Sequence, residues 1–154
     1  LFRSDKDKLF GYDEGFFALN VTKKDMNNND FNIESYKGKY LLIDFWGTWC
    51  NPCIALLPHI VQLNKRYPDL QIVSIAYEID EKGKNKVPDL IKKHQMHWRN
   101  IVETNRESIK ATSTYKVSSF PTTILIDPEG KIIHRGGSEK MTELDKKLMQ
   151  IFLE

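Results

Sequence analysis

Cys50 and Cys53 are the residues of this sequence whose type and spacing most directly suggest chemistry. A disulfide between them would enclose two residues and close almost no loop, so it would restrict the unfolded chain very little. A structural staple is therefore a poor explanation of the pair. Reversible thiol chemistry and metal binding are better explanations, since both use cysteines at this spacing, and an inert pair is the remaining alternative.

The elements around the pair favour thiol chemistry. The apolar run 40–46 predicts a buried strand, and 51–67 has apolar residues at helical spacing, with Pro52 suited to a first turn. A helix that begins beside Cys50 presents unpaired N–H groups and a partial positive charge, which lower the pKa of a thiol. We therefore expect Cys50 to be the attacking thiolate and Cys53, one turn into the helix, to resolve a mixed disulfide.

A metal site is not expected. Zinc sites take about four ligands, usually from a second pair of cysteines or histidines. The sequence has no third cysteine, and apart from His59 its histidines are scattered along the chain: His94, His97 and His134. Covalent haem attachment would require a histidine directly after Cys53, where Ile54 stands. We expect neither a metal nor another cofactor.

The composition is that of one soluble globular domain. The chain has 154 residues, 40% hydrophobic and 29% charged, with a formal net charge of +2. These values exclude a disordered tail, a collagen-like repeat and a disulfide-dense miniprotein. The charge is too balanced to predict a nucleic acid or a membrane as partner, and no apolar run approaches the roughly 18 residues of a membrane span. Because the chain begins at Leu1 rather than Met, we expect either a fragment or the removal of an upstream signal or anchor.

The remaining segments extend the pattern of strands and helices. We predict further strands at 15–22, 70–77, 98–102, 121–127 and 131–135, and helices at 88–97, 104–116 and 139–154. The polar stretches 23–30 and 81–86 are predicted to be loops, and 127–130 (DPEG) a turn. Strand–helix–strand units imply parallel pairing, and the last two strands imply a hairpin. The expected fold is a single α/β domain over 1–154, with a central mixed β-sheet flanked by helices on both faces.

Asp44 and Pro121 are two further residues that could take part in the chemistry. Asp44 lies in the middle of the apolar run 40–46, where loss of hydration raises the pKa of a carboxyl group. Such a group could accept the proton of Cys53, directly or through water, although an acid satisfied at a strand end is the alternative. Pro121 could be a proline that begins a strand, or it could follow Phe120 through a cis peptide bond.

The run 43–53 (IDFWGTWCNPC) resembles the active-site segment of thioredoxin-fold thiol-disulfide oxidoreductases. Asp44 stands where thioredoxins carry a buried acid, and Pro58 stands where they kink the active-site helix. The tripeptide Phe120-Pro121-Thr122 is similar to their cis-proline loop, and the hairpin around the DPEG turn is similar to their closing hairpin.

Within that superfamily the chain most resembles the TlpA/ResA-like subgroup, over about residues 16–152. The segment before 37–39 is similar to that subgroup's N-terminal hairpin, whereas 1–14 forms an extension outside the resemblance. The long gap between the cysteines and Pro121 leaves room for an α/β insert at about 81–103.

The resemblance implies an enzyme, a protein-disulfide reductase that acts on exported partner proteins. It implies that Cys50, Cys53 and Asp44 are catalytic, and that six neighbouring residues contact the substrate: Trp49, Asn51, Pro52, Phe120, Pro121 and Thr122. Many members of the subgroup have Gly-Pro between the cysteines, where this chain has Asn51-Pro52. That dipeptide tunes the redox potential in the family.

The resemblance also implies partners and a location. We expect disulfide-containing client proteins and an upstream thiol reductant protein, no nucleic acid, no membrane contact by the domain itself, and a monomer. Members of the subgroup are usually exported and tethered outside the bacterial inner membrane, so we expect a periplasmic or extracytoplasmic protein with or without a membrane tether. Two alternatives stay open: a binding module for clients in cytochrome c maturation or metal delivery, and a peroxide-reducing antioxidant. The Pro-x-x-x-Thr-x-x-Cys pattern of peroxiredoxins is absent.

Overall fold

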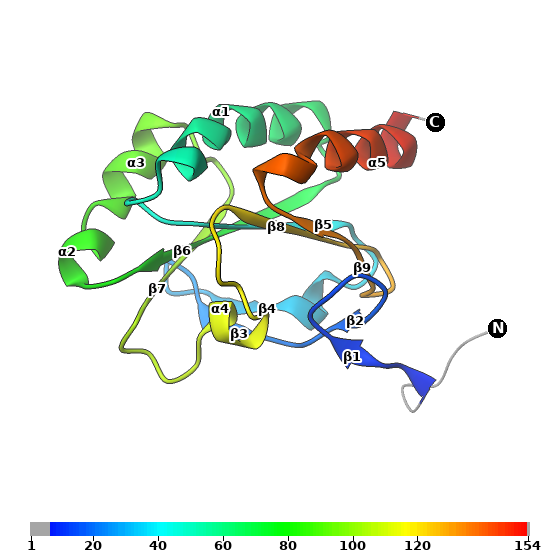
Figure 1. The fold of residues 1–154 in the computed structure, drawn as a ribbon, viewed down its shortest axis with the longest axis horizontal. Helices are drawn as coiled ribbons and strands as arrows, with labels where there is room; N and C mark the ends of the chain where they lie inside the picture. Colours follow the sequence, from blue (N-terminus) through cyan, green and yellow to red (C-terminus); the bar gives the residue numbers. More distant parts are fainter. Residues whose placement is uncertain (1–6, 154) are drawn as a thin grey trace.

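A five-stranded mixed sheet forms the centre of the computed structural model, which describes residues 7–153 (Figure 1). In spatial order the strands are β7 (Arg99–Thr104), β6 (Gln71–Glu78), β5 (Leu41–Trp46), β8 (Thr122–Ile126) and β9 (Ile132–Gly136). β5, β6 and β7 are parallel, whereas β8 is antiparallel to β5 and β9 is antiparallel to β8. The first residues of the expected extension, 1–6, lie outside the described part of the chain.

The strand β5 is buried along its whole length. Its neighbours are β6 on one side and β8 on the other, so both of its edges are paired within the sheet. An unbroken apolar run is what a strand covered on both faces requires. The prediction of a buried central strand at 40–46 is therefore confirmed.

Three helices cover one face of the sheet, at the top of Figure 1: α1 (Asn51–Arg66), α3 (Val87–Lys93) and α5 (Met141–Leu153). α1 and α5 pack on this face through Ile60 and Leu148, which lie in one buried cluster with Leu42 of β5. α3 joins a second cluster through Val87, together with both cysteines. The sheet and α1 thereby bring the cysteine segment and the insert to the same face.

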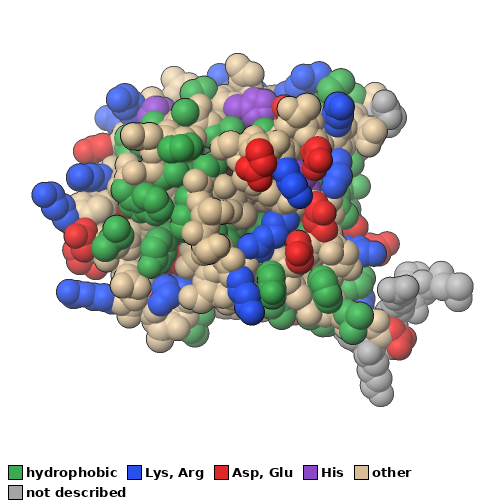
Figure 2. Space-filling view, in the orientation of Figure 1, with side chains coloured by type: hydrophobic (Ala, Val, Ile, Leu, Met, Phe, Trp, Pro, Cys, Tyr) green, Lys and Arg blue, Asp and Glu red, His purple; other side chains and the backbone are tan. Residues whose placement is uncertain are grey.

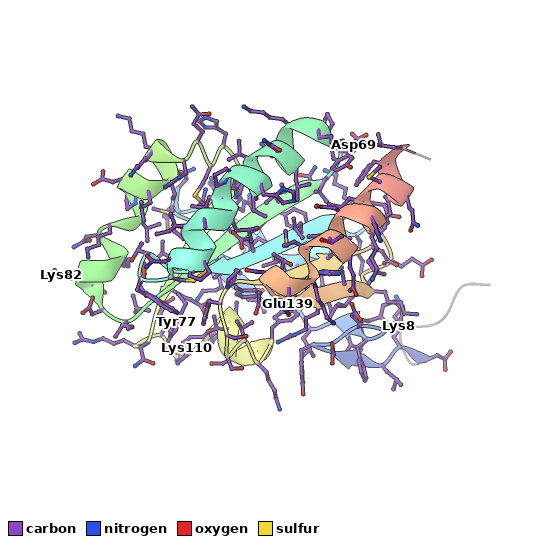
Figure 3. All side chains as sticks on the ribbon, turned by 45° about the horizontal axis from the view of Figure 1, so that its top comes forward. Lys8, Asp69, Tyr77, Lys82, Lys110 and Glu139 are labelled. Carbon is purple, nitrogen blue, oxygen red and sulfur yellow. A yellow bond between two sulfur atoms is a disulfide. The ribbon has the colours of Figure 1, made fainter. Side chains whose placement is uncertain are left out.

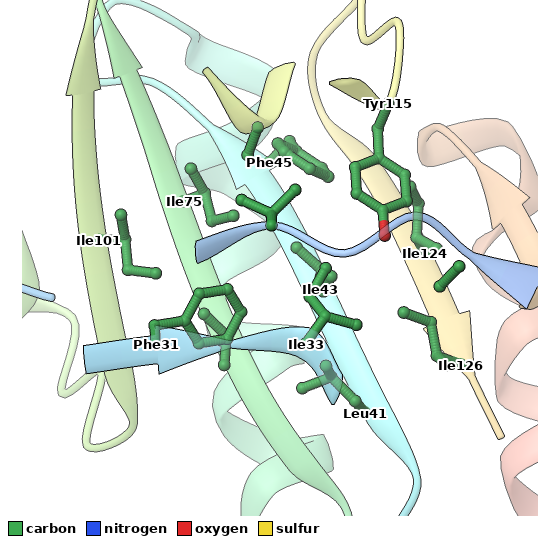
Figure 4. Packing of buried hydrophobic residues seen from close by; sticks show 14 of the residues in the cluster. Phe31, Ile33, Leu41, Ile43, Phe45, Ile75, Ile101, Tyr115, Ile124 and Ile126 are labelled. Carbon is green, nitrogen blue, oxygen red and sulfur yellow. The ribbon is translucent and has the colours of Figure 1, made fainter. Parts of the chain in front are cut away.

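The opposite face is covered mainly by N-terminal strands, so the expectation of helices on both faces is only partly right. β3 (Thr22–Lys24) and β4 (Asp30–Asn32) form an antiparallel hairpin, and Phe31 packs with Ile43 and Ile75 of the sheet (Figure 4). The 3-10 helix Ile33–Tyr36 and α4 (Ala111–Thr114) complete this layer. Upstream of the hairpin, β1 (Phe10–Gly11) pairs in parallel with β2 (Phe17–Ala18). β3 begins at the last residue of the predicted strand 15–22, and β3 and β4 take up both ends of the predicted loop 23–30, with β4 continuing to Asn32.

A buried ion pair ties this hairpin to the sheet. Nζ of Lys23 lies 2.7 Å from Oε1 of Glu103, and their side chains are 6% and 0% exposed. The same carboxylate accepts hydrogen bonds from the amides of Ala111 and Thr112. Because its oxygens have both a cation and N–H donors, the buried charge of Glu103 is compensated.

Two predicted segments differ from the structure. The prediction of a helix over 104–116 is wrong except at α4. The carboxylate of Glu103, near the end of β7, accepts the amides of Ala111 and Thr112 at the start of α4, so these amides cannot continue a helix that begins at residue 104. The prediction of a loop over 81–86 is also wrong, because α2 (Glu81–Lys84) lies there. The carboxylate of Asp80 caps α2 by accepting the Gly83 amide at 2.9 Å.

No helix within residues 7–153 has both the length and the apolar character needed to cross a bilayer.

Candidate active site

Cys50 and Cys53 form a disulfide at the start of α1, where the chain leaves β5 (Figure 3). Cys50 is the N-cap of the helix, and its Sγ accepts the amide of Cys53 at 3.2 Å. That N–H group and the helix dipole stabilise negative charge on Cys50 when the pair is reduced. Cys50 is 5% exposed and Cys53 1%, so Cys53 is the deeper sulfur, as its position one turn into the helix predicts.

Aromatic side chains border the disulfide. Trp49 is 47% exposed, and its indole Nε1 donates to the carbonyl oxygen of Tyr77 at 2.9 Å. The rings of Trp49 and Phe120 form a T-shaped pair with 5.2 Å between centroids, and Tyr77 stacks on Phe120 at 5.9 Å. A glycine at position 47 is required here, because a Cβ atom on Gly47 would lie 2.5 Å from Nε1 of Trp49. The result is a partly exposed aromatic rim beside Cys50.

The loop before β8 lies against this rim. The Phe120–Pro121 peptide bond is cis, which was the second of the two alternatives for Pro121. Pro121 and Thr122 are buried, and the Thr122 hydroxyl donates to the carbonyl of Ser119 at 2.7 Å. Phe120 is half-buried and carries the contact with Trp49. The structure thus brings the Phe120-Pro121-Thr122 loop to the segment that holds the cysteines.

The two residues between the cysteines, Asn51 and Pro52, are exposed on the first turn of α1. Both cysteines are buried beneath them, Cys53 more deeply than Cys50. Their position leaves them free to meet a docked protein, and Pro52 has no N–H group to leave unpaired at the helix start.

Asp44 lies beneath the helix layer, on the same face of β5 as Leu42 and Trp46, because side chains alternate along a strand. It is 1% exposed, and the hydroxyl of Ser74 donates to its Oδ2 at 3.3 Å. Burial raises the pKa of Asp44 to about 7, and the hydrogen bond from Ser74 opposes that rise. Oδ1 of Asp44 has no hydrogen-bond partner in the described structure. The prediction of an acid with a raised pKa is confirmed.

Glu78 is a second buried acid near the cysteines, and sequence reasoning missed it. It is 0% exposed, and its Oε1 accepts the amide of Thr48 at 2.9 Å. This bond fixes the loop between β5 and α1, two residues before Cys50. The available signal was an acid directly after the apolar run 70–77, which parallels the acid inside 40–46.

Within residues 7–153, no three or more histidine, cysteine, aspartate or glutamate side chains are placed to hold a metal ion. Nε2 of His59 is hydrogen-bonded to Oδ1 of Asp145 on α5, at 2.8 Å.

The family of the chain follows from comparison with known proteins. The model of the AhpC/TSA family matches residues 15–135. The chain belongs to this family. The thiol-disulfide oxidoreductase ResA of Bacillus subtilis (strain 168) is 32% identical over 120 residues, which cover 78% of this chain and 65% of that ResA. The ResA of Bacillus thuringiensis subsp. konkukian (strain 97-27) is 30% identical over 135 residues, covering 87% of this chain and 76% of that ResA.

Solved structures agree. A thiol-disulfide oxidoreductase from Bacteroides fragilis NCTC 9343 superposes with a TM-score of 0.70 at 26% identity, over 86% of this chain and 98% of that one. The expected thioredoxin-like α/β fold, with its N-terminal hairpin, is confirmed. The chain is a ResA-like thiol-disulfide oxidoreductase with a Cys-x-x-Cys disulfide.

Proposed function

We propose that this member of the AhpC/TSA family reduces disulfides in partner proteins by dithiol–disulfide exchange. The observation that carries the proposal is the Cys50–Cys53 pair at the N-terminus of α1, with an amide N–H directed at Sγ of Cys50. In the reduced protein this environment favours the Cys50 thiolate, which is the nucleophile that exchange requires.

The exchange proceeds in two steps. The Cys50 thiolate attacks one sulfur of the client disulfide, a Cys50–client disulfide forms, and the second client sulfur leaves as a thiolate that takes a proton from water. Cys53 then loses its proton, its Sγ attacks Sγ of Cys50, and the first client sulfur leaves as a thiolate that takes up a proton in turn. The client gains two electrons and two protons and becomes a dithiol, while the enzyme ends as the Cys50–Cys53 disulfide.

Asp44 is the proposed proton acceptor for Cys53. A thiol attacks poorly until it loses its proton, and a buried thiol cannot give that proton to bulk water. The pKa of Asp44, raised by burial to about 7, places the carboxyl close to the pH at which a general base works best near neutrality. Asp44 lies on the sheet face that α1 covers, where Cys53 is buried.

The client is proposed to bind across the aromatic rim and the cis-proline loop. The side chains of Trp49 and Ile79 are 47% and 65% exposed. Figure 2 shows hydrophobic side chains gathered on the visible face of the molecule, next to the start of α1. An extended client segment would pair with the backbone beside Pro121 and place its cysteine against Cys50, with Asn51 and Pro52 at its edge. A net charge of only +2 fits recognition by shape and apolar contact.

We further propose that the domain is a monomer that works outside the cytoplasm, on exported clients, and is re-reduced by another thiol protein. The support is the TlpA/ResA-like resemblance and the relatives named ResA. The N-terminal extension 1–14 and the insert 81–103, which a plain thioredoxin lacks, are the proposed places where partner choice is encoded.

Trapping of clients tests the proposal. A Cys53→Ser variant, expressed in the native cell, should accumulate mixed disulfides through Cys50, because nothing remains to resolve them. Cys50→Ser is the matched control and should trap none. The wild type should reduce insulin disulfides. No trapping and no insulin reduction would indicate a binding module, and peroxide consumption by the reduced protein would indicate an antioxidant.

The redox potential tests the direction. Equilibration with dithiothreitol or glutathione should give a reducing value. A value near the roughly −120 mV of the strong oxidant DsbA would contradict a reductase.

A further inference from the structure

We propose that Trp98 is a positioning residue for Asp44, and that through the hydroxyl of Ser74 it determines which oxygen of the Asp44 carboxyl receives the proton. The inference rests on the proposed function, since the proton concerned is the one that Cys53 releases. Trp98 precedes β7 and lies within the insert 81–103, so this role would link the insert to the chemistry of the cysteines.

Three side chains from separate parts of the chain form a row of hydrogen bonds. Nε1 of Trp98 lies 2.8 Å from Oγ of Ser74, and that Oγ lies 3.3 Å from Oδ2 of Asp44. Ser74 of β6 is the residue paired with Asp44 of β5 in the sheet. Ser74 is 0% exposed and Asp44 is 1% exposed, so bulk water does not compete for these bonds.

The chemistry of the three groups fixes the direction of each bond. An indole N–H can only donate, so Oγ of Ser74 is the acceptor from Trp98. A serine hydroxyl has one hydrogen, and the indole cannot accept it. That hydrogen is therefore directed at Oδ2 of Asp44. Without the indole N–H, the hydroxyl would be free to rotate and to accept from Asp44 instead.

The two oxygens of Asp44 consequently differ. Oδ2 faces the hydrogen of Ser74 whether the carboxyl is charged or neutral, so a proton placed on Oδ2 would meet that hydrogen. Oδ1 has no hydrogen-bond partner in the described structure and is available. The geometry points to Oδ1 as the atom that takes the proton when Cys53 attacks. One hydrogen-bond donor lowers the pKa of a buried carboxyl group less than two donors would, but more than none.

Few charged groups face this carboxyl. Across the sheet, Asp44 is paired with Ser74 of β6 and Thr123 of β8, which are uncharged. On α1 and α3, Cys50 and Cys53 are joined in a disulfide, His59 is paired with Asp145, and His94 is half-buried with an Nε2 that has no hydrogen-bond partner in the described structure. On β6, the buried Glu78 accepts the Thr48 amide through Oε1. The other charged groups of α1, α3 and the link to β7 are exposed: Lys65, Arg66, Asp89, Lys92, Lys93 and His97. Burial and the Ser74 bond are the causes of the shifted pKa of Asp44. The Ser74 bond is thus the adjustable contact.

Titration of the Asp44 carboxyl in the oxidised protein tests the inference without any catalytic turnover. Carbon-13 NMR of labelled aspartate would follow Asp44 in the wild type and in two variants, Trp98→Phe and Ser74→Ala. Trp98→Phe keeps an aromatic ring and removes the N–H group. Ser74→Ala should raise the midpoint by about one pKa unit, the effect of losing one hydrogen bond to a charged group. Trp98→Phe should raise it in the same direction by a smaller amount.

Trp46→Phe is the matched control. Trp46 is also buried, lies on the same face of β5, and has an Nε1 with no hydrogen-bond partner in the described structure, so the same substitution removes an N–H that holds nothing. It should leave the Asp44 midpoint in place. A Trp98→Phe shift no larger than that of Trp46→Phe would overturn the proposal. So would an equal Trp98→Phe shift in the Ser74→Ala background, because Trp98 would then act on Asp44 without Ser74.

A kinetic measurement separates this inference from the proposed function. If the midpoint rises from about 7 to about 8, the ionised fraction of Asp44 at pH 7 falls about fivefold, and resolution by Cys53 should slow by about the same factor. A midpoint that shifts without any change in the resolving rate would refute the role of Asp44 as proton acceptor and leave the positioning by Trp98 intact. A midpoint that does not shift would refute the positioning alone.

Discussion

Replacing Asp44 by asparagine should stabilise the oxidised protein, and the gain should grow with pH. Asparagine has nearly the shape of the neutral carboxyl and keeps an oxygen that can accept from Ser74. The substitution therefore removes the ionisation of the side chain while leaving its packing largely in place. The oxidised form is the right state for this test, because the disulfide removes the titration of Cys50 and Cys53.

The magnitude follows from the shifted pKa. Burial raises the pKa of Asp44 from 3.8 to about 7 in the folded protein, so the folded state holds this proton more tightly than the unfolded state does. Below about pH 4 the carboxyl is neutral in both states, and its ionisation has no effect on stability. Between about pH 4 and 7 the unfolded state ionises first, so the free energy of unfolding decreases as pH rises. Above about pH 7 the full difference applies, about 4 kcal/mol at ~1.36 kcal/mol per pKa unit.

Urea unfolding of the oxidised wild type and of Asp44→Asn, at steps from pH 4 to pH 8, provides the assay. The stability difference between the two proteins should be small near pH 4 and should rise toward about 4 kcal/mol at pH 8, with equal urea m-values. Other titrating groups are common to both proteins and cancel in the difference. Asp69→Asn is the control, since Asp69 lies exposed on the turn before β6 and its neutralisation should give a small difference at every pH.

A stability difference that stays constant from pH 4 to pH 8 would refute the reasoning, because it would mean that Asp44 ionises as easily in the folded protein as in the unfolded chain. A loss of stability at pH 8 would refute it as well. That result would mean that the charged carboxylate has a compensating partner in the fold.

Two further sets of substitutions test the other buried acids, Glu78 and Glu103. Glu78→Ala should lower the free energy of unfolding by about 1–3 kcal/mol and reduce insulin turnover, because the Thr48 amide loses its acceptor, whereas Glu78→Gln should retain most of both since an amide oxygen remains. Equal urea stability of the two variants would contradict this. Lys23→Met should cost about 3–5 kcal/mol at pH 7 in thermal or urea unfolding, because it leaves the buried Glu103 carboxylate without its cation. The further change Glu103→Gln should restore part of the loss, and no restoration would mean that Lys23 acts through packing alone.

Local patterns were sufficient to predict the parts of the site that are close in the chain. The spacing of Cys50 and Cys53, the run 40–46 and the position of Pro52 each have a local physical meaning, so the strand, the helix and the thiol pair could be predicted together. Asp44 could be predicted because an acid in an apolar strand is conspicuous by itself. The cis bond before Pro121 could be predicted from resemblance, since a strand-start proline was the alternative.

Contacts between distant segments could not be predicted in this way. Ser74 is an ordinary small residue of an apolar strand, and Trp98 lies 24 residues later. Only the pairing of β5 with β6, and the return of the chain through α3, places them in one row with Asp44. The failed helix over 104–116 has the same cause: its helix propensity is overridden by the Glu103 carboxylate, which takes the amides of residues 111 and 112.

The same burial that makes Asp44 costly for stability makes it useful for the proposed exchange. A carboxylate on the surface, with a pKa near 4, would be ionised at neutral pH but too weak a base to take a proton from a thiol. Burial raises the pKa of Asp44 and makes it a stronger base, whereas the hydrogen bond from Ser74 limits that rise. A large fraction of the Asp44 carboxyl therefore remains ionised near pH 7. In the proposed exchange, transfer of the Cys53 proton to Asp44 would neutralise the buried charge and so remove its energetic cost in that step. The raised pKa of Asp44 therefore has two effects with one cause, the burial of the carboxylate. It lowers the free energy of unfolding of the oxidised protein by about 4 kcal/mol, and it increases the affinity of Asp44 for the proton that is transferred in the resolving step.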